Sequence, residues 1–292
     1  MIETRLLQYF LAVAEEQSIT RAAEFLHISQ PTLSKQMMDL EALLGKKLLI
    51  RGKKQITLTE EGEYLRGKAR EIMDLIAQTE SAFHDSDTGV GGDVYIGCGE
   101  FASIYPLMQD IQNVQSQYPD IHAHFFSGNA ELIIERMDKG LVDFGILLEP
   151  SFHDKYEYFK LSKDETWGIL MREDCPLAAK KTITRGDLSS VPLIMPSQSS
   201  NSGKLSAWLN QTTESVAPVA TYNLIYNASL MVAAGIGYAL CISGIANTSE
   251  ESPLTFRPLE PALHSDIYLV CKKYQTFSKP AKLLMERLKS LS

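Results

Sequence analysis

The chain has 292 residues, of which 45% are hydrophobic and 22% charged, and its formal net charge is −8. This composition is typical of a folded protein of two or more domains and excludes a disordered chain, a collagen-like repeat and a disulfide-stapled miniprotein. No apolar run approaches the roughly 18 residues of a membrane helix, and the N-terminus does not have the pattern of a signal peptide. We therefore expect a cytoplasmic protein with no membrane partner.

Apolar residues at helical spacing predict three short helices within the first 45 residues. Ser18 and Ser29 are placed to cap the second and third helices, at about residues 19–26 and 30–44. Pro31 is tolerated in the first turn of the third helix, because amides there have no intrahelical partner. Two short helices joined by a tight turn and preceded by another helix form a helix-turn-helix.

The third helix presents hydrogen-bonding side chains of the kind that read base edges and phosphates, although a solvated polar face is the alternative for any one of them. Residues 46–59 predict a short β-hairpin, a wing, and five cations with no acid lie between Lys46 and Lys54. This acidic chain therefore concentrates positive charge where a helix-turn-helix meets DNA. The residues expected to contact DNA are Ser29, Gln30, Pro31, Thr32, Ser34, Lys35, Arg51, Lys53 and Lys54.

The run Ser29-Gln30-Pro31-x-x-Ser34, followed by Leu40-Glu41 and Leu44-Gly45, is specific. On these residues the stretch resembles the DNA-binding region of LysR-type transcriptional regulators. The resemblance implies a sequence-specific regulator that binds double-stranded operator DNA and is not an enzyme. Lys35 stands where the family usually has arginine, and it keeps the charge but loses bidentate geometry. Leu49 stands where the family usually has phenylalanine. Further matching residues are Phe10, Ala12, Val13, Ser18, Ala22, Ala23, Leu26, Gln36, Leu48, Arg51, Leu58, Thr59 and Gly62.

Residues 59–83 predict one long helix of roughly 38 Å, at about 1.5 Å per residue. Its apolar residues repeat with heptad spacing, which is typical of a helix that pairs with another. The alternative is a single amphipathic helix packed on its own domain. Similar regulators dimerise through this helix, so the resemblance implies a homodimer or homotetramer. Residues 84–92 predict a hinge. The seam comprises Leu65, Ala69, Ile72, Ile76, Thr79 and Phe83.

Strand and helix patterns alternate from residue 93 to the C-terminus, which predicts an α/β sheet. In such sheets ligands bind beyond the carboxyl ends of strands, at helix N-termini. Four loops there hold polar residues, at 97–103, 127–129, 196–202 and 226–229, although helix capping explains each of them about as well. Among the polar residues of these loops, Glu100, Ser103, Ser127, Asn129 and Asn227 are expected to bind an effector. The resemblance to LysR-type regulators implies Phe101 and Ser197 as further pocket residues.

The resemblance extends to this region, which is similar to the family's periplasmic-binding-protein-like effector domain with two subdomains around a cleft. The expected domains are a winged helix-turn-helix at 1–58 and a linker helix with hinge at 59–88. The effector domain then comprises subdomain I at 89–162 and 266–292, and subdomain II at 163–265. Glu100 departs from the neutral residue of many relatives, and a buried carboxylate there would suit a cationic group better than an anionic ligand.

Other chemistry has little support in the sequence. Four cysteines without a Cys-x-x-Cys pair, and six histidines without a ligand pattern, predict no metal and no cofactor. A redox switch, with Cys175 and Cys241 as the first pair to consider, remains an alternative, as does a ligand-independent DNA binder. An α/β enzyme with a regulatory head is a remote alternative, because no nucleophile elbow, P-loop or catalytic carboxylate pair is present.

Overall fold

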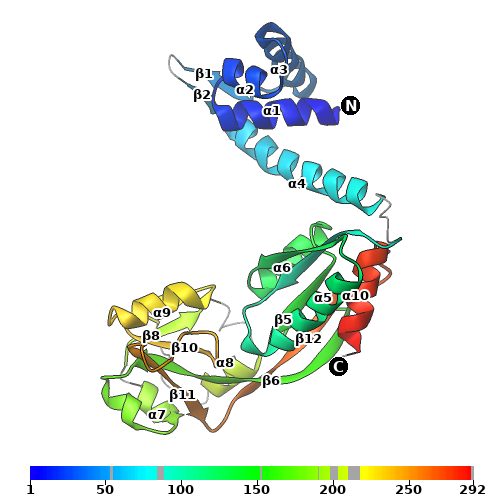
Figure 1. The fold of residues 1–292 in the computed structure, drawn as a ribbon. Coiled ribbons are helices and arrows are strands. Elements are labelled where there is room, and N and C mark those ends of the chain that lie inside the picture. The colour runs from blue at the N-terminus through cyan, green and yellow to red at the C-terminus, as the bar shows by residue number, and fades with distance from the viewer. Residues whose placement is uncertain are drawn as a thin grey trace. The chain divides into compact units, whose positions relative to one another are not determined.

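The computed structural model describes residues 1–52, 55–83, 89–151, 153–189, 191–197, 203–209 and 218–290. The chain divides into two compact units, Met1–Phe83 and His84–Ser292 (Figure 1). Within the described residues, no helix is both long and apolar enough to cross a membrane.

The first unit confirms the predicted helix-turn-helix and hairpin. Ser18 accepts a hydrogen bond from the N–H of Arg21, and Ser29 accepts one from the N–H of Thr32, so both predicted caps are present. His27 adopts a positive φ of 54° in the turn between the two helices, a conformation that histidine tolerates better than most residues. The elements are α1 (Thr4–Glu16), α2 (Ile19–Phe25), α3 (Gln30–Leu44), β1 (Leu49–Arg51), β2 (Ile56–Leu58) and α4 (Glu60–Ala82).

A buried carboxylate joins α3 to the hairpin. Glu41 is only 8% exposed, and its Oε1 accepts hydrogen bonds from the N–H groups of Leu48, at 2.9 Å, and Leu49, at 3.2 Å. Lys47 Nζ lies 2.6 Å from its Oε2. Burial opposes ionisation of Glu41, but these donors outweigh it and hold its pKa below the usual value. The carboxylate thus satisfies N–H groups that the start of the hairpin would otherwise bury unpaired.

Thr59 caps helix α4, because its side chain accepts a hydrogen bond from the N–H of Gly62. The helix then extends away from α1, α2 and α3 (Figure 1). Its first two seam residues, Leu65 and Ala69, are buried in the core of the first unit. Further along, Ile72 is 39% exposed and Phe83 is 84% exposed. The heptad seam is therefore divided between the unit's own core and an exposed apolar stripe.

The second unit is built on a ten-stranded mixed sheet. Eight strands follow the order β4-β3-β5-β12-β6-β10-β8-β9, while β11 pairs with β6 and β7. The strands are β3 (Gly92–Cys98), β4 (Ile121–Ser127), β5 (Phe144–Leu148), β6 (Tyr156–Arg172), β7 (Ile183–Thr184), β8 (Leu193–Pro196), β9 (Ala220–Tyr222), β10 (Tyr238–Ile242), β11 (Leu254–Glu260) and β12 (His264–Lys272). The predicted α/β sheet is confirmed.

The long strand β6 connects two lobes of this unit (Figure 1). It pairs with β12 as far as Thr166, and from Trp167 onward it pairs with β10 and β11. The register with β12 shifts between Asp266 and Ile267. We call the part built on β3, β4 and β5 the first lobe, and the part built on β7 to β11 the second lobe.

Helices cover the sheet and complete separate apolar cores in the two lobes. Helices α5, α6 and α10 pack on the first lobe, with α5 and α10 in mutual contact, and α7, α8 and α9 belong to the second lobe (Figure 1). The helices are α5 (Tyr105–Gln117), preceded by the 3-10 turn Ala102–Ile104, then α6 (Ala130–Asp138), α7 (Arg185–Leu188), preceded by the 3-10 turn Pro176–Ala179, and finally α8 (Gly203–Leu209), α9 (Ile225–Ala233) and α10 (Lys279–Lys289).

Replacing Glu41 with Ala is expected to lower the free energy of unfolding of the first unit by about 1–3 kcal/mol, because two buried N–H groups lose their acceptor. Because the pKa of Glu41 is lowered in the folded protein, its contribution is complete above the unfolded-state value of about 4.3. The contribution is then lost as the pH falls through the lower folded-state pKa. Urea unfolding followed by circular dichroism, at neutral pH and below that window, measures both effects.

The exposed Glu24 provides a matched control, and Glu24→Ala should leave the transition unchanged. Both tryptophans, Trp167 and Trp208, lie in the second unit. The unfolding transition followed by tryptophan fluorescence should therefore be the same in the unaltered chain, in Glu41→Ala and in Glu24→Ala. The role given to Glu41 would be contradicted if both variants lowered the free energy of unfolding equally. It would also be contradicted if the effect of Glu41→Ala persisted at low pH.

Candidate functional site

Helix α3 presents a polar, solvent-exposed face. Gln30, Pro31, Thr32 and Lys35 are exposed, while Leu33 is fully buried on the opposite side. The Ser29 and Thr32 hydroxyls lie 2.7 Å apart, so these two predicted DNA contacts also hydrogen-bond to each other at the helix start. The structure thus brings the predicted residues of α3 together on one accessible surface.

The hairpin is tied to this helix through Arg51. Its Nη2 donates to the hydroxyl of Ser34 at 3.3 Å, which places an exposed guanidinium beside the polar face of α3. Arg51 and Ser34 were both predicted to contact DNA, and the structure brings them together. Lys53 and Lys54, which were also predicted to contact DNA, lie outside the described residues.

The second unit contains a cavity of about 140 Å³ between its two lobes. Most of its walls are apolar, and they come from the ends of strands and the starts of helices in both lobes. The cavity is lined by Gly99, Glu100, Phe101, Gly128, Asn129, Ala130, Leu147, Leu148, Glu149, Trp167, Pro196, Leu205, Tyr222, Asn223, Leu224, Ile225, Ile242, Ile245 and Ser265. A second cavity of about 720 Å³ shares Glu100, Phe101 and Ile225 with it and also includes Ser127.

Glu100 and Phe101 reach from the first lobe to the second. The Oε2 atom of Glu100 accepts a hydrogen bond from the N–H of Ile225, the first residue of α9, at 3.3 Å. Phe101 packs against the apolar cores of both lobes. Gly99 is required beside it, because a Cβ at that position would lie 2.2 Å from the Phe101 ring. Both predicted residues therefore lie where the lobes meet.

Ser103 was predicted to contact the effector, but its polar atoms bind a buried carboxylate. Its hydroxyl and its N–H, the latter at 3.4 Å, both donate to Oε1 of Glu165. Glu165 lies on β6 and is 3% exposed. It ties the loop that carries Glu100 to the strand that connects the lobes. Sequence reasoning missed Glu165, because its partner lies 62 residues away in the chain.

The other predicted effector residues fall into two groups. Asn129 lines the smaller cavity and also caps α6 by accepting from the N–H of Leu132 at 3.0 Å, and Ser127 lines the larger cavity. Neither Ser197 nor Asn227 is among the residues that line the two cavities. The expectation of a loop at 226–229 was wrong, because α9 already begins at Ile225 and Asn227 is exposed in its first turn. Of the predicted loop at 196–202, residues 198–202 lie outside the described residues.

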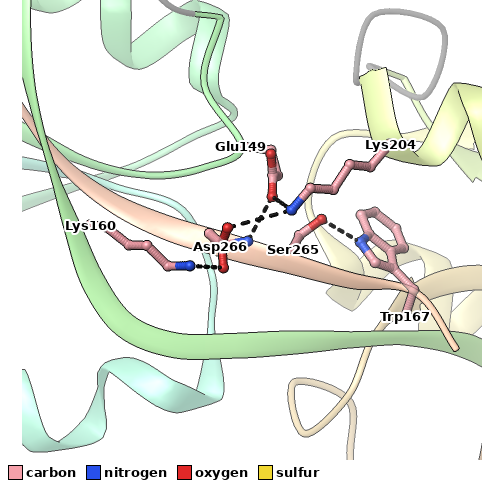
Figure 2. Close-up of polar contacts among 6 residues, drawn as sticks. All are labelled: Glu149, Lys160, Trp167, Lys204, Ser265 and Asp266. Atoms are coloured by element: carbon pink, nitrogen blue, oxygen red, sulfur yellow. Dashed lines mark hydrogen bonds and ion pairs between the residues drawn. The ribbon is translucent and has the colours of Figure 1, made fainter.

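A network of charged side chains spans the lobes (Figure 2), and one of its members, Glu149, lines the cavity. Lys204 of α8 lies 2.6 Å from Oε1 of Glu149, at the end of β5, and 3.4 Å from Oδ2 of Asp266 on β12. Lys160 contacts the other oxygen of Asp266 at 2.8 Å. The N–H of Asp266 donates to Glu149 at 2.8 Å, and Glu149 has a positive φ of 42°. Sequence reasoning missed this network.

Beside this network, the indole N–H of Trp167 donates to the hydroxyl of Ser265 at 2.9 Å (Figure 2). Trp167 and Ser265 both line the cavity. The polar contacts along β6 and β12 therefore continue to the cavity wall.

The cysteines are mostly buried thiols. Burial, with a smaller contribution from the Glu100 carboxylate, raises the pKa of Cys98 to about 12, and burial raises that of Cys241 to about 12. Cys175 packs against one apolar core of the second lobe and Cys241 belongs to another. The described part of the chain contains no group of three or more histidine, cysteine and acidic side chains that could hold a metal ion.

Replacing Lys204 with Met is expected to loosen the contact between α8 and β5. Because Lys204 is 47% exposed, the loss is about 1 kcal/mol or less, and amide exchange at residues 203–209 should become up to about fivefold faster. Hydrogen–deuterium exchange measured by mass spectrometry reports this change. Lys155→Met is the matched control, since Lys155 pairs with Asp138 within the first lobe. Unchanged exchange in α8 would contradict a bridging role for Lys204.

Known proteins match both units of the chain. Residues 4–63 match the family described as "Bacterial regulatory helix-turn-helix protein, lysR family", and residues 87–292 match the "LysR substrate binding domain". The Hca operon transcriptional activator HcaR of Escherichia coli (strain K12) is 32% identical over 304 residues, covering 100% of both chains. The uncharacterized HTH-type transcriptional regulator YvbU of Bacillus subtilis (strain 168) is 28% identical over 291 residues, covering 98% of this chain and 97% of the relative.

The fold is similarly shared along the whole chain. The crystal structure of full-length CbnR complexed with its target DNA has a TM-score of 0.76 to this chain at 20% identity, and it covers 100% of both chains. Together with the two matched regions, this agrees with the predicted winged helix-turn-helix, linker helix and α/β effector domain. The chain belongs to the LysR family: it is a DNA-binding transcriptional regulator with a C-terminal effector-binding domain, and not an enzyme.

Proposed function

We propose that this regulator binds double-stranded operator DNA as a homodimer or homotetramer and responds to a small molecule held between the lobes of its second unit. The observation that carries the proposal is the apolar cavity at the meeting point of the lobes. A ligand that contacts both lobes favours one arrangement of the lobes over others, and such a preference is what a switch requires. A regulator of operator DNA acts where the chromosome is, which supports a cytoplasmic location.

On the DNA side, the exposed face of α3 is the part that reads bases in this proposal. Gln30, Thr32 and Lys35 are accessible there, and amide, hydroxyl and ammonium groups can all hydrogen-bond to base edges in the major groove. Arg51 lies beside them and is suited to a phosphate, because its guanidinium is exposed and always charged. Phosphate contacts position the helix, and base contacts supply the specificity.

The apolar stripe on α4 is the surface for a second copy of the chain in this proposal. Leu65 and Ala69 are buried in the core of the first unit, whereas Ile72 and Phe83, which lie further along the same heptad seam, are exposed. Exposed apolar residues at this spacing are the pattern of a helix that pairs with another helix. Such pairing would bring two copies of α3 to two half-sites of one operator.

On the effector side, the lobes are proposed to move as subdomain I, at 89–162 and 266–292, and subdomain II, at 163–265. The register shift between Asp266 and Ile267 supports a boundary there, because pairing of β12 with β6 is irregular at that point. The hinge between the units is proposed for residues 84–92, of which 84–88 lie outside the described residues. The proposed effector contacts are Glu100, Phe101, Ser127 and Asn129. Ser103 is proposed to position the loop that carries Glu100, through its hydrogen bonds to Glu165.

A redox-responsive regulator is the alternative function, and it has less support. A reactive cysteine is normally an accessible thiolate, whereas Cys98 and Cys241 are buried with raised pKa values. Cys175 and Cys241 also pack in different cores.

Replacing Gln30 with Ala is expected to weaken binding to the specific operator by about 1–3 kcal/mol, with little change in non-specific binding. Replacing Arg51 with Ala should weaken both kinds of binding and reduce the slope of log affinity against log salt by about 1, as for one lost phosphate contact. Fluorescence anisotropy with operator and scrambled duplexes across a salt series measures both variants. Lys273→Ala, an exposed lysine of the second unit, is the control. Equal losses on both duplexes for Gln30→Ala would argue against base reading by that residue.

Replacing Ile72 with Glu is expected to shift the full chain toward monomers, because a charge would be buried in the paired seam. Analytical ultracentrifugation over a concentration series measures the dissociation constant, which should rise at least about tenfold, equivalent to about 1.4 kcal/mol. Ala77→Glu introduces the same charge at an exposed position outside the seam and should have a smaller effect. If both variants associate as the unaltered chain does, the dimer surface lies elsewhere.

A further inference from the structure

The cavity between the lobes is small and has a defined polarity. Its volume of about 140 Å³ is close to that of an apolar protein cavity that takes up benzene, about 150 Å³. Phe101, Trp167 and Ile242 are among its apolar walls. The cavity therefore fits a compact apolar group about the size of one six-membered ring.

The charged residues that line this cavity are both acidic. Glu100 and Glu149 line it, and no lysine or arginine is among its lining residues within the described part of the chain. Because this cavity is only partly open to solvent and most of its walls are apolar, electrostatic interactions in it are stronger than in bulk water. An anionic group in this cavity would meet two carboxylates and no cation of the lining.

The position that best suits an anion is already taken by the protein. The first N–H groups of a helix have no partner within the helix, and they lie at the positive end of the helix dipole, so the N-terminus of α9 favours negative charge. Its cap residue, Leu224, makes no side-chain cap hydrogen bond. The Oε2 atom of Glu100 fills this role instead, by accepting from the N–H of Ile225. A ligand carboxylate would have to displace Glu100 to reach the same position.

Lys204, which pairs with the lining residue Glu149, is also engaged. Lys204 lies within ion-pair distance of both Glu149 and Asp266, so its charge is shared between two carboxylates (Figure 2). Neither Oε1 of Glu100 nor Oε2 of Glu149 takes part in a hydrogen bond between described residues. Each carboxylate therefore keeps an acceptor oxygen for a ligand.

We infer that the effector is a small apolar molecule bearing an ammonium group, and that Glu100 sets this preference. This inference rests on the proposed function, because it concerns the ligand of the same cavity. The apolar part of the molecule fills the cavity, and its ammonium group donates to the free carboxylate oxygen of Glu100. Glu100 is thus a specificity-determining residue, which both attracts the cation and occupies the anion position at α9.

The test uses the full chain at neutral pH with three probes of matched size: benzylamine, benzyl alcohol and benzoate. Ligand-observed NMR titration gives a dissociation constant for each probe. In the unaltered protein, benzylamine is expected to bind at least about tenfold more tightly than benzoate, a difference of about 1.4 kcal/mol. Glu100→Gln keeps the shape and an acceptor oxygen but removes the charge, so the preference for benzylamine should shrink about tenfold. Glu173→Gln changes an exposed glutamate outside the cavity and should leave the ranking intact.

The ranking in the unaltered chain tests the inference even if Glu100→Gln does not fold. Benzoate binding as tightly as benzylamine would overturn the ammonium class while leaving a ligand cavity in place. A ranking that is the same in folded Glu100→Gln would overturn the role of Glu100. Binding of none of the three probes at millimolar concentration would overturn both this inference and the proposed effector cavity. Operator binding, measured separately, would still stand.

Discussion

The second unit depends on the way strands β6 and β12 connect its two lobes. Because β6 pairs with β12 in one lobe and with β10 and β11 in the other, the same backbone hydrogen bonds that build the sheet also hold the lobes together. The polar groups that span the lobes collect along these two strands: Glu165 lies on β6, and Asp266 lies on β12. A change in the angle between the lobes therefore acts on these contacts first, next to the cavity.

In the first unit, too, polar side chains join separate elements of the fold. Glu41 joins α3 to the start of the hairpin from inside, and Arg51 joins the hairpin to Ser34 from outside. Helix α3 and the hairpin are thus joined both by the buried Glu41 and by the exposed Arg51. Because Leu65 and Ala69 of α4 belong to the same core, the long helix extends this rigid body. A movement of α4 therefore carries α3 and the hairpin with it.

Local patterns in the sequence predicted much of the fold, and the failures have physical reasons. The caps of α2 and α3 were predictable because Ser18 and Ser29 bond to N–H groups only three residues away. The start of α9 was misplaced because its capping carboxylate comes from Glu100, 125 residues earlier. The contact between Lys204 and Glu149 joins residues 55 positions apart and leaves no local pattern. Side chains that span the lobes are therefore the part of the site that sequence reasoning cannot assemble.

The left-handed backbone of Glu149 has a consequence for how firmly the lobes are held. A non-glycine residue in this conformation costs on the order of 1–3 kcal/mol unless its surroundings offset it, and the contacts of Glu149 with Lys204 and Asp266 are what oppose that cost. The stabilisation that these contacts provide is therefore partly offset by the cost of holding Glu149 in this backbone conformation. The contacts of Glu149 with Lys204 and Asp266 therefore hold the lobes together less firmly than they would if Glu149 had an extended backbone.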